Sequence, residues 1–259
     1  MMGLFKEELA ALRPELAQGV RCLFTEREGG VSSGPWGGVD GIMGLNVATH
    51  VGDNAGCVNM NRQIVAQLTP QAPRWMTQVH STAVVDAESV ESDACEADAQ
   101  ISLTPGVVCA VQVADCLPVL IAEVNGKAVA AVHAGWRSLA GGIVEATIDR
   151  LRERLCDPQA QFKAWLGPRI GKSEFEVGEE VKSVFEAAYP NVCDAIVPGA
   201  EADKYLVDLG AYAVHALTRS GVEAVDDCGL STYADAKRFY SYRRDGDRSG
   251  RHAALIWIE

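Results

Sequence analysis

The stretch VVCAVQVADCLPVLIAEVNGKAVAAVHAGWR, residues 107–137, determines the centre of the fold. It contains three short apolar runs rich in β-branched residues and bounded by turn residues, a pattern typical of buried strands. The expected strands are 107–113, 119–122 and 128–132. Asn125-Gly126 lies between the last two, and Asn-Gly is the strongest two-residue signal for a β-hairpin. The stretch therefore predicts strands joined by a tight turn.

Outside this stretch the chain mixes further strands with helices. Similar apolar runs predict strands at 20–24, 84–85, 162–166, 223–225 and 253–258. Capping residues and helical spacing predict helices at 54–68, 139–155, 178–188 and 209–219. Because strands and helices do not alternate strictly, we expect an α+β fold. No linker or repeat divides the 259 residues, so one domain over 1–259 is predicted, with the acidic segment 88–98 as a surface excursion.

The charge balance limits the partners of the protein. The chain has 23 Lys and Arg against 35 Asp and Glu, which gives a net charge of −12. An acidic protein does not attract a phosphate backbone or an anionic membrane by general electrostatics, so we expect neither nucleic acid nor membrane as a partner. An anionic small molecule would have to be bound by a few arginines at defined positions.

The cysteines and the first residues indicate a cytoplasmic protein. Eight cysteines stand at 22, 57, 95, 109, 116, 156, 193 and 228, without any Cys-x-x-Cys pair. Scattered cysteines of this kind are typical of reduced thiols. Segment 1–20 carries five charged residues and no continuous apolar run, so it is not expected to be a signal peptide. The longest apolar runs are too short to span a bilayer.

Three local patterns contain candidate metal ligands: His80 after Gln78-Val79, Cys116 in the segment 114–118, and His133 where a strand meets a helix. Two imidazoles and a thiolate form a familiar zinc set, and three protein ligands leave a fourth position open, as catalytic zinc requires. The same residues also fit a metal-free site, in which Cys116 is the nucleophile and a histidine is its base. Both interpretations need a deprotonated thiol near an imidazole, so both stay open here.

The turn after His133 is a candidate anion site. Ser138 is a good helix N-cap, and Gly141-Gly142 would expose backbone N–H groups at a helix start beside Arg137. Two other patterns indicate loops. Gly29-Gly30 after Arg27 is a tight turn without the residues of a phosphate-binding loop, and segment 241–245 indicates a solvated hairpin with a surface salt bridge.

Several longer motifs occur in a fixed order: RxGGVSxGP, LNxxxHVGDN, QVHS, VADCLPVLI, AAVHAGWRSLAGGIVE, WLGPRIG, FEVGEEV, DKYLVDL and FYSYRRDGDRSGRHAALIW. In these motifs the chain resembles the bacterial laccase-domain family, also called multicopper polyphenol oxidase, purine nucleoside phosphorylase or peptidoglycan editing factor. The resemblance runs from about residue 21 to the C-terminus, and segment 1–20 would be peripheral. It implies a four-layer α/β/β/α sandwich with mixed sheets.

The resemblance also implies a function. It implies a zinc ion, with copper as a possible substitute, bound by His80, Cys116 and His133. It implies phosphorolysis of adenosine, inosine and S-methyl-5′-thioadenosine, with adenosine deaminase as a side activity. In phosphorolysis, phosphate attacks the anomeric carbon of the ribose while the purine leaves. Zinc would act most directly in deamination, because it lowers the pKa of a coordinated water to about 7.

The resemblance places further residues around one pocket. Arg27 and Arg137 are the candidates for phosphate, and Asn46 and Gln78 are those for sugar or base. Asp115 would orient a ligand or move a proton, which makes it the fourth catalytic candidate beside the three zinc ligands. The partners expected are thus a nucleoside and phosphate, with the oligomeric state left open.

Rival functions remain. A multicopper oxidase needs many histidine ligands in His-x-His pairs, and this chain has five histidines and no such pair, so polyphenol oxidation is not expected. One alternative is an amide hydrolase that removes a wrongly incorporated amino acid from a peptidoglycan precursor. Another is a metal-binding protein without catalytic activity. Ser231 departs from the family, which usually has cysteine there, and we expect it to serve only in packing or hydrogen bonding.

Overall fold

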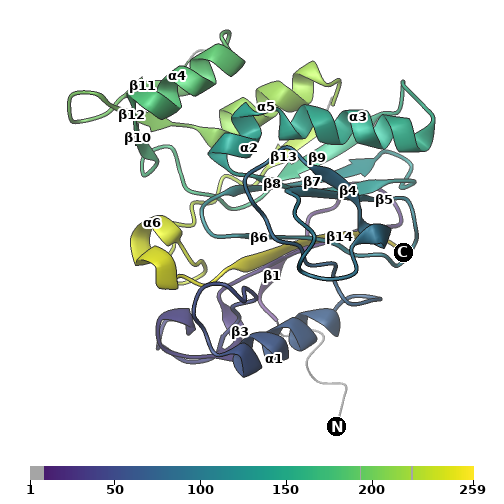
Figure 1. Cartoon of the computed structure of the whole chain (residues 1–259), viewed down its shortest axis with the longest axis vertical. Helices are drawn as coiled ribbons and strands as arrows, with labels where there is room; N and C mark the ends of the chain where they lie inside the picture. The colour runs from purple at the N-terminus through teal and green to yellow at the C-terminus, as the bar shows by residue number, and fades with distance from the viewer. Residues whose placement is uncertain (1–8, 193, 223) are drawn as a thin grey trace.

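The computed structural model describes residues 9–192, 194–222 and 224–259. These residues form four layers, with two sheets between outer layers of helices (Figure 1). The α+β class and the four-layer arrangement expected from the sequence are confirmed. The described part of segment 1–20 is not peripheral, because the strand Ala11–Leu12 pairs with the strand Val20–Thr25 and Leu16 is buried in the core. Residues 1–8, Cys193 and Glu223, the first residue of an expected strand, lie outside the described residues.

The larger sheet has the order β13-β9-β7-β8-β5-β4. Its strands are β4 (Val84–Asp86), β5 (Ala99–Ser102), β7 (Leu117–Glu123), β8 (Val129–Ala134), β9 (Phe162–Leu166) and β13 (Ala224–Asp227). The predicted hairpin is confirmed, because β7 and β8 are antiparallel neighbours and Gly126 in their turn has a φ of 74°. The pairs β4–β5 and β9–β13 are parallel, so the sheet is mixed.

The second sheet has the order β1-β2-β14-β6 and is antiparallel throughout. Its strands are β1 (Ala11–Leu12), β2 (Val20–Thr25), β6 (Cys109–Val113) and β14 (His252–Ile258). The stretch 107–137 therefore divides between the two sheets, because β6 lies in one and β7 and β8 lie in the other. Residues 114–116 make the crossing from the second sheet to the larger one.

Three helices cover the outer face of the larger sheet, and one lies beyond the second sheet (Figure 1). The three are α2 (Trp136–Ala140), α3 (Ile143–Leu155) and α5 (Leu209–Arg219), and the other is α1 (Ala55–Ala66). A further helix, α4 (Glu179–Ala188), packs on α2 and on the short strands Glu176–Gly178 and Lys204–Val207. The helix expected over 139–155 is in fact two, because Gly142 has a φ of 92° and interrupts it. The remaining elements are β3 (Glu28–Ser32), β10 (Glu176–Gly178), β11 (Ile196–Pro198), β12 (Lys204–Val207), α6 (Tyr242–Asp245), η1 (Gly34–Trp36), η2 (Ala87–Ser89) and η3 (Gly246–Arg248).

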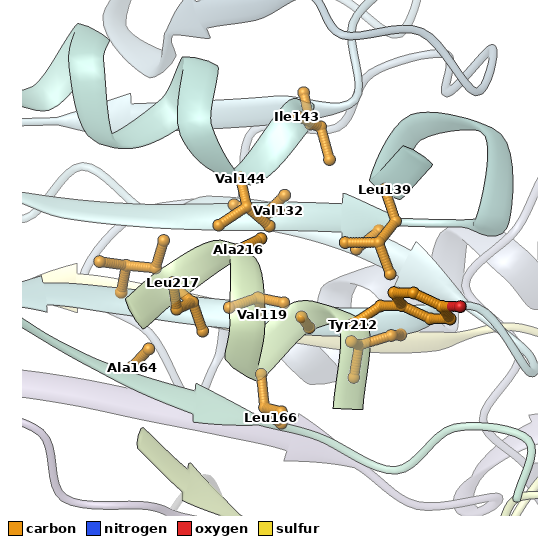
Figure 2. Close-up of a cluster of buried hydrophobic side chains, with 14 of the residues drawn as sticks. Val119, Val132, Leu139, Ile143, Val144, Ala164, Leu166, Tyr212, Ala216 and Leu217 are labelled. Atoms are coloured by element: carbon orange, nitrogen blue, oxygen red, sulfur yellow. The ribbon is translucent and has the colours of Figure 1, made fainter. Parts of the chain in front are cut away.

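Apolar side chains fill the three spaces between the layers. One cluster lies between the larger sheet and its helices, and Figure 2 shows Ile143 and Val144 of α3 beside Val132 of β8. A second cluster lies between the sheets, and a third lies between the second sheet and α1. No helix among the described residues is long and apolar enough to cross a membrane.

His252 on β14 is a buried titratable group in this core. Its Nε2 atom accepts a hydrogen bond from the backbone N–H of Tyr240 at 2.8 Å, and its ring lies among those of Phe24, Phe239 and Tyr240. Burial lowers the pKa of His252 to about 3. The folded protein therefore needs a neutral ring, whereas the unfolded chain binds a proton below a pKa of about 6.5.

We predict that the free energy of unfolding falls as the pH drops below about 6.5, by up to about 1.4 kcal/mol per pH unit from His252 alone. Urea unfolding at pH 7.5, 6.0 and 5.0 measures this slope. His252→Gln should be less stable at pH 7.5 but should show a shallower loss on acidification than the original protein. The control is His215→Gln, at a histidine outside this core. Equal slopes for the original protein and His252→Gln would contradict the assignment.

Candidate metal centre and substrate cavity

His80, Cys116 and His133 converge, with their ligand atoms all within 4.8 Å of one another. The Sγ atom of Cys116 lies 3.7 Å from the Nε2 atom of His80, and the two imidazole rings are 4.8 Å apart, edge to face. Among the described residues this is the one group of three or more such side chains that could hold a metal ion. Residues 36 and 17 positions apart in the sequence thus form one cluster.

The fold positions each of these residues separately. Cys116 immediately precedes β7, and His133 lies opposite Pro118 near the end of the neighbouring strand β8. His80 belongs to a loop and has a φ of 58°. Gly135 closes the cluster, because a Cβ atom at this position would lie 2.5 Å from Cδ2 of His80 and 3.3 Å from Sγ of Cys116. Only glycine fits so close an approach.

Asp98 fixes two of the three residues. This fully buried carboxylate accepts hydrogen bonds from Nδ1 of His133 at 2.8 Å and from the backbone N–H of His80 at 3.0 Å. It also accepts from the backbone N–H and the hydroxyl of Ser81. Burial would raise the pKa of Asp98, but the bonds from His133 and Ser81 outweigh it and lower the pKa to about 2. A carboxylate that holds the second nitrogen of a metal-binding histidine is a common arrangement.

Cys116 and His133 form a charged pair in this environment. Burial acts to raise the pKa of the Cys116 thiol, yet the nearby His133 and His80 lower it to about 6. Burial likewise acts to lower the pKa of His133, whereas Cys116 and Asp98 raise it to about 9. The thiol is therefore prepared for deprotonation. Two imidazole nitrogens and a thiolate are a donor set that suits zinc, so these residues fit a metal ion.

The cluster lies in the wall of a cavity of about 690 Å³. Four lining residues belong to the core between the larger sheet and its helices and are called the apolar wall: Trp136, Ile170, Phe175 and Leu209. Five polar lining residues are called the polar wall: Thr49, His50, Thr77, Gln112 and Arg251. The remaining lining residues are Met76, Gln78, Asp93, Val113, Ala114, Asp115, Arg137, Tyr242 and Arg243, besides the three cluster residues. A cavity of this size holds a small organic molecule.

The structure brings three of the five expected pocket residues to the cavity. Gln78 lines it, with its side-chain amide bonded to both the backbone N–H and the carbonyl of Gln112. Arg137 lines it, exposed and stacked 4.2 Å from the ring of Trp136. Asp115 lines it beside Cys116.

Arg27 and Asn46 do not line the cavity, which corrects the expectation drawn from the resemblance. Arg27 donates to the carbonyls of Gly37 and Ala236 and stacks on Tyr240. Asn46 is fully buried, and its Oδ1 atom accepts from the backbone N–H of Arg251 at 2.9 Å. Both hold neighbouring segments in place.

Asp115 holds together the segments that cover the cavity. Its φ of 82° is in the left-handed region, where non-glycine residues are uncommon. One carboxylate oxygen accepts from the hydroxyl of Thr232 at 2.6 Å, and the other accepts from the Ser241 hydroxyl and the Arg243 backbone N–H. Because both carboxylate oxygens are already bonded, Asp115 positions Arg243 and has little capacity left to bind a ligand.

Other expectations need correction. The N-cap of α2 is Gly135 and not Ser138, and the N–H groups of Gly141 and Gly142 already donate to backbone carbonyls, so they form no anion site. Segment 241–245 forms the helix α6 and not a hairpin, although the expected salt bridge exists between Arg244 and Asp245. Asp98, at the end of the acidic segment, is buried and not on the surface.

Sequence reasoning missed Arg243 and Arg251 as cavity residues. The guanidinium of Arg243 donates to the carbonyls of Glu174 and Glu176. That of Arg251 donates to the carbonyls of Ser249 and Gly250. The motif FYSYRRDGDRSGRHAALIW contains both arginines, but no feature of the motif indicates which of its residues face a cavity.

Ser231 lies outside the cavity lining. Its hydroxyl donates to a carboxylate oxygen of Glu174 at 3.1 Å and accepts from the backbone N–H groups of Gly171 and Ala234. These contacts support the hydrogen-bonding role expected for it.

The fold and the cluster together define an α+β protein with a three-donor metal site in a substrate-sized cavity. The family model described as multi-copper polyphenol oxidoreductase laccase matches residues 21–259. The chain belongs to this family, and the resemblance inferred from its motifs is confirmed.

Several relatives are similar over nearly the whole chain. A purine nucleoside phosphorylase of Pseudomonas aeruginosa is 42% identical, over 93% of this chain and 94% of its own. The purine nucleoside phosphorylase YfiH of Escherichia coli is 40% identical, over 93% and 95%. The crystal structure of a Neisseria meningitidis protein has a TM-score of 0.86 at 40% identity, over 96% and 99%. That of YlmD from Geobacillus stearothermophilus has a TM-score of 0.83 at 26% identity, over 93% of each chain.

We predict that the purified protein binds about one zinc ion per chain, because His80, Cys116 and His133 form one cluster of three metal ligands. His80→Ala, Cys116→Ala and His133→Ala should each lose the metal and keep their fold, as judged by elemental analysis and circular dichroism. Asp98→Asn should weaken zinc binding about 10–100-fold, since it removes the group that orients His133. His215→Ala and Cys57→Ala, at residues outside the cluster, are the controls. Full zinc content in all three ligand variants would refute the site.

Replacing Ser231 by cysteine tests the family departure. Because the hydroxyl of Ser231 bonds to Glu174 and to backbone N–H groups, outside the cavity lining, Ser231→Cys should leave kcat/KM within about threefold, a change below about 1 kcal/mol. The kinetic measurement uses the activity proposed below. A hundredfold gain would instead show that a thiol at this position takes part in the reaction.

Proposed function

We propose that this protein is a metal-dependent purine nucleoside phosphorylase. The observation that carries the proposal is the His80–Cys116–His133 cluster in the wall of a cavity of about 690 Å³ that is also lined by three arginines. Among the described residues, none of these arginines forms an ion pair with a carboxylate. The relatives named purine nucleoside phosphorylase support the same reaction class.

The substrates proposed are adenosine, inosine and S-methyl-5′-thioadenosine. The apolar wall, with the rings of Trp136 and Phe175, suits the flat face of a purine, because aromatic rings stack in this way. The three arginines suit the phosphate, which carries negative charge that the rest of this acidic chain would repel. One cavity thus offers surfaces for both substrates.

The reaction forms a bond between a phosphate oxygen and C1′ of the ribose and breaks the bond between C1′ and N9 of the purine. The electron pair of the broken bond goes to the purine, which takes up a proton. The products are the free base and ribose 1-phosphate, or 5-methylthioribose 1-phosphate from S-methyl-5′-thioadenosine. The residues of this chain hold the two substrates in contact and exclude water, which supplies a large part of such a barrier reduction. Asp115 contributes by fixing Arg243 over the cavity.

His80, Cys116 and His133 are the residues that would hold the metal. When bound, zinc or copper would supply Lewis-acid chemistry, which is what an accompanying deamination of adenosine requires. Asp98 is bonded to the Nδ1 atom of His133, so the Nε2 atom is the one that would bind the metal. Gln78 stabilises the loop before His80 through its two bonds to Gln112.

A second candidate function is hydrolysis of an amide, as in the editing of peptidoglycan precursors. It is favoured by the contacts among three side chains. The pKa of the Cys116 thiol is lowered by the neighbouring imidazole of His133, and the carboxylate of Asp98 orients that imidazole. This is the arrangement of a cysteine hydrolase. A role in metal binding without catalysis is less favoured, because the cavity beside the cluster would then have no use.

The requirement for phosphate distinguishes these functions. We predict that inosine and adenosine yield free base and ribose 1-phosphate only when inorganic phosphate is present, as followed by chromatography. Cys116→Ala should abolish this product, and Cys57→Ala should retain it. Equal release of free base without phosphate would indicate a hydrolase. No release from any nucleoside under either condition would refute the proposed function.

A further inference from the structure

The polar wall of the cavity contains an arginine and a glutamine side by side. Gln112 on β6 lies opposite Ala253 on β14, and Arg251 precedes Ala253 by two residues. Side chains alternate along a strand, so Arg251 and Gln112 are diagonal neighbours on one face of the sheet. Farther along this face, Ala110 and Leu255 belong to the apolar core toward α1. The pair therefore stands where that core ends and the cavity begins.

Arg251 is held in place without being neutralised. Its backbone N–H donates to the buried Asn46, and one guanidinium nitrogen donates to the carbonyls of Ser249 and Gly250. Among the described residues it has no ion pair, and burial lowers its pKa although Cys116, Asp115 and Asp247 are close enough to act against this shift. Its other nitrogens keep donors for a ligand.

Gln112 carries a buried acceptor that the protein leaves without a partner. Its residue is 7% exposed and lines the cavity, and its Oε1 atom has no hydrogen-bond partner among the described residues. The amide of Gln78 fixes the backbone of Gln112 through both its N–H and its carbonyl, so the side chain starts from a rigid position. A buried acceptor without a partner is costly, and on a residue that lines a cavity it points to a ligand that donates a hydrogen bond.

Arg251 supplies the positive charge of this wall, because the ring of His50 is held toward its neutral form. Burial lowers the pKa of His50, and so do the nearby Arg251 and Arg62. Asp93 also lines the cavity, but its carboxylate is bound to Arg62 at 2.7 Å. A ligand at this wall therefore faces the charge of Arg251 with one neighbouring carboxylate already compensated.

We propose that Arg251 and Gln112 form the subsite for inorganic phosphate, with Arg251 binding its negative oxygens and Gln112 accepting a hydrogen bond from its P–OH group. This inference rests on the proposed phosphorylase function and assigns the second substrate to the polar wall. The nucleoside then occupies the apolar wall. Neither Arg27 nor Arg137 is the principal phosphate ligand, because Arg27 is outside the cavity and Arg137 is exposed to solvent, which screens its charge.

The subsite also distinguishes between two anions of similar shape. Inorganic phosphate carries at least one proton at neutral pH and can donate to the Oε1 atom of Gln112, whereas sulfate carries none. Sulfate would leave this buried acceptor without a partner. Sites built to pair with a substrate hydrogen reject analogues that lack it.

Calorimetric titration of the metal-loaded protein with phosphate and with sulfate tests the inference. The original protein should bind phosphate at least about tenfold more tightly than sulfate, from one hydrogen bond gained. Arg251→Gln should weaken phosphate binding about a hundredfold through the loss of charge-assisted bonds. Arg251→Lys, which keeps the charge, should recover part of the affinity. Gln112→Met, similar in size, should reduce the preference for phosphate over sulfate to less than about threefold.

Arg219→Gln is the control, because it removes one positive charge from the exposed end of α5. In kinetics, Arg251→Gln should raise the KM for phosphate much more than the KM for nucleoside, whereas a general loss of folding would lower kcat alone. Unchanged phosphate affinity in folded Arg251→Gln, or equal affinity of the original protein for phosphate and sulfate, would overturn the subsite. If nucleosides are not cleaved, the proposed function fails, and the titrations still decide whether Arg251 and Gln112 bind phosphate.

Discussion

The candidate site depends on one buried carboxylate. Asp98 has no exposed surface, yet it stays ionised because His133, the Ser81 side chain and three backbone N–H groups all donate to it. A buried charge without such partners would be strongly unfavourable. Because His133 lies on β8 and His80 and Ser81 lie in a loop, these bonds connect the sheet to the loop. The spacing of the two imidazole rings follows from this connection, because His80 and His133 are 53 positions apart in the sequence.

The crossing between the two sheets is the second constraint. Residues 114–116 leave β6 in one sheet and enter β7 in the other, so the chain has to turn within three residues. Asp115 adopts a φ of 82° there, and its carboxylate binds Thr232, Ser241 and Arg243. This short crossing therefore presents Cys116 to the cavity and also anchors the C-terminal segments that cover it. Strain at Asp115 is compensated by three hydrogen bonds from parts of the chain more than a hundred residues away.

Local sequence patterns predicted which helices and strands form better than they predicted which residues the fold buries. The Asn125-Gly126 turn and the apolar runs on either side of it indicate a hairpin by local rules, and the structure has it. Residue types alone suggested His80, Cys116 and His133, because these side chains have few other shared uses. Asp98 could not be predicted, since an acidic segment is usually exposed and only the pairing of β5 with β8 buries its end. The break at Gly142 depends on a backbone angle that glycine permits but does not require.

The wrong predictions about which residues line the cavity have a related cause. A family motif marks Arg27 and Asn46 as strongly as Arg243 and Arg251, because it does not separate residues that contact a ligand from residues that hold a neighbouring segment. Asn46 illustrates the point, since its amide oxygen binds the backbone N–H of Arg251, which lies 205 positions away. Asn46 affects the cavity indirectly, because it holds the backbone of Arg251, and this contact is visible only in the folded structure.

The acidic composition and the arginine-lined cavity are compatible for a physical reason. Elsewhere in the chain, Arg150, Arg169 and Arg238 are paired with carboxylates, which neutralises them. Arg243 and Arg251 are bound by backbone carbonyls instead, and a carbonyl orients a guanidinium without cancelling its charge. The net charge of −12 therefore does not decide what the cavity attracts. What decides it is which partners fix the arginines, and in this protein backbone oxygens fix them while leaving their positive charge for an anion.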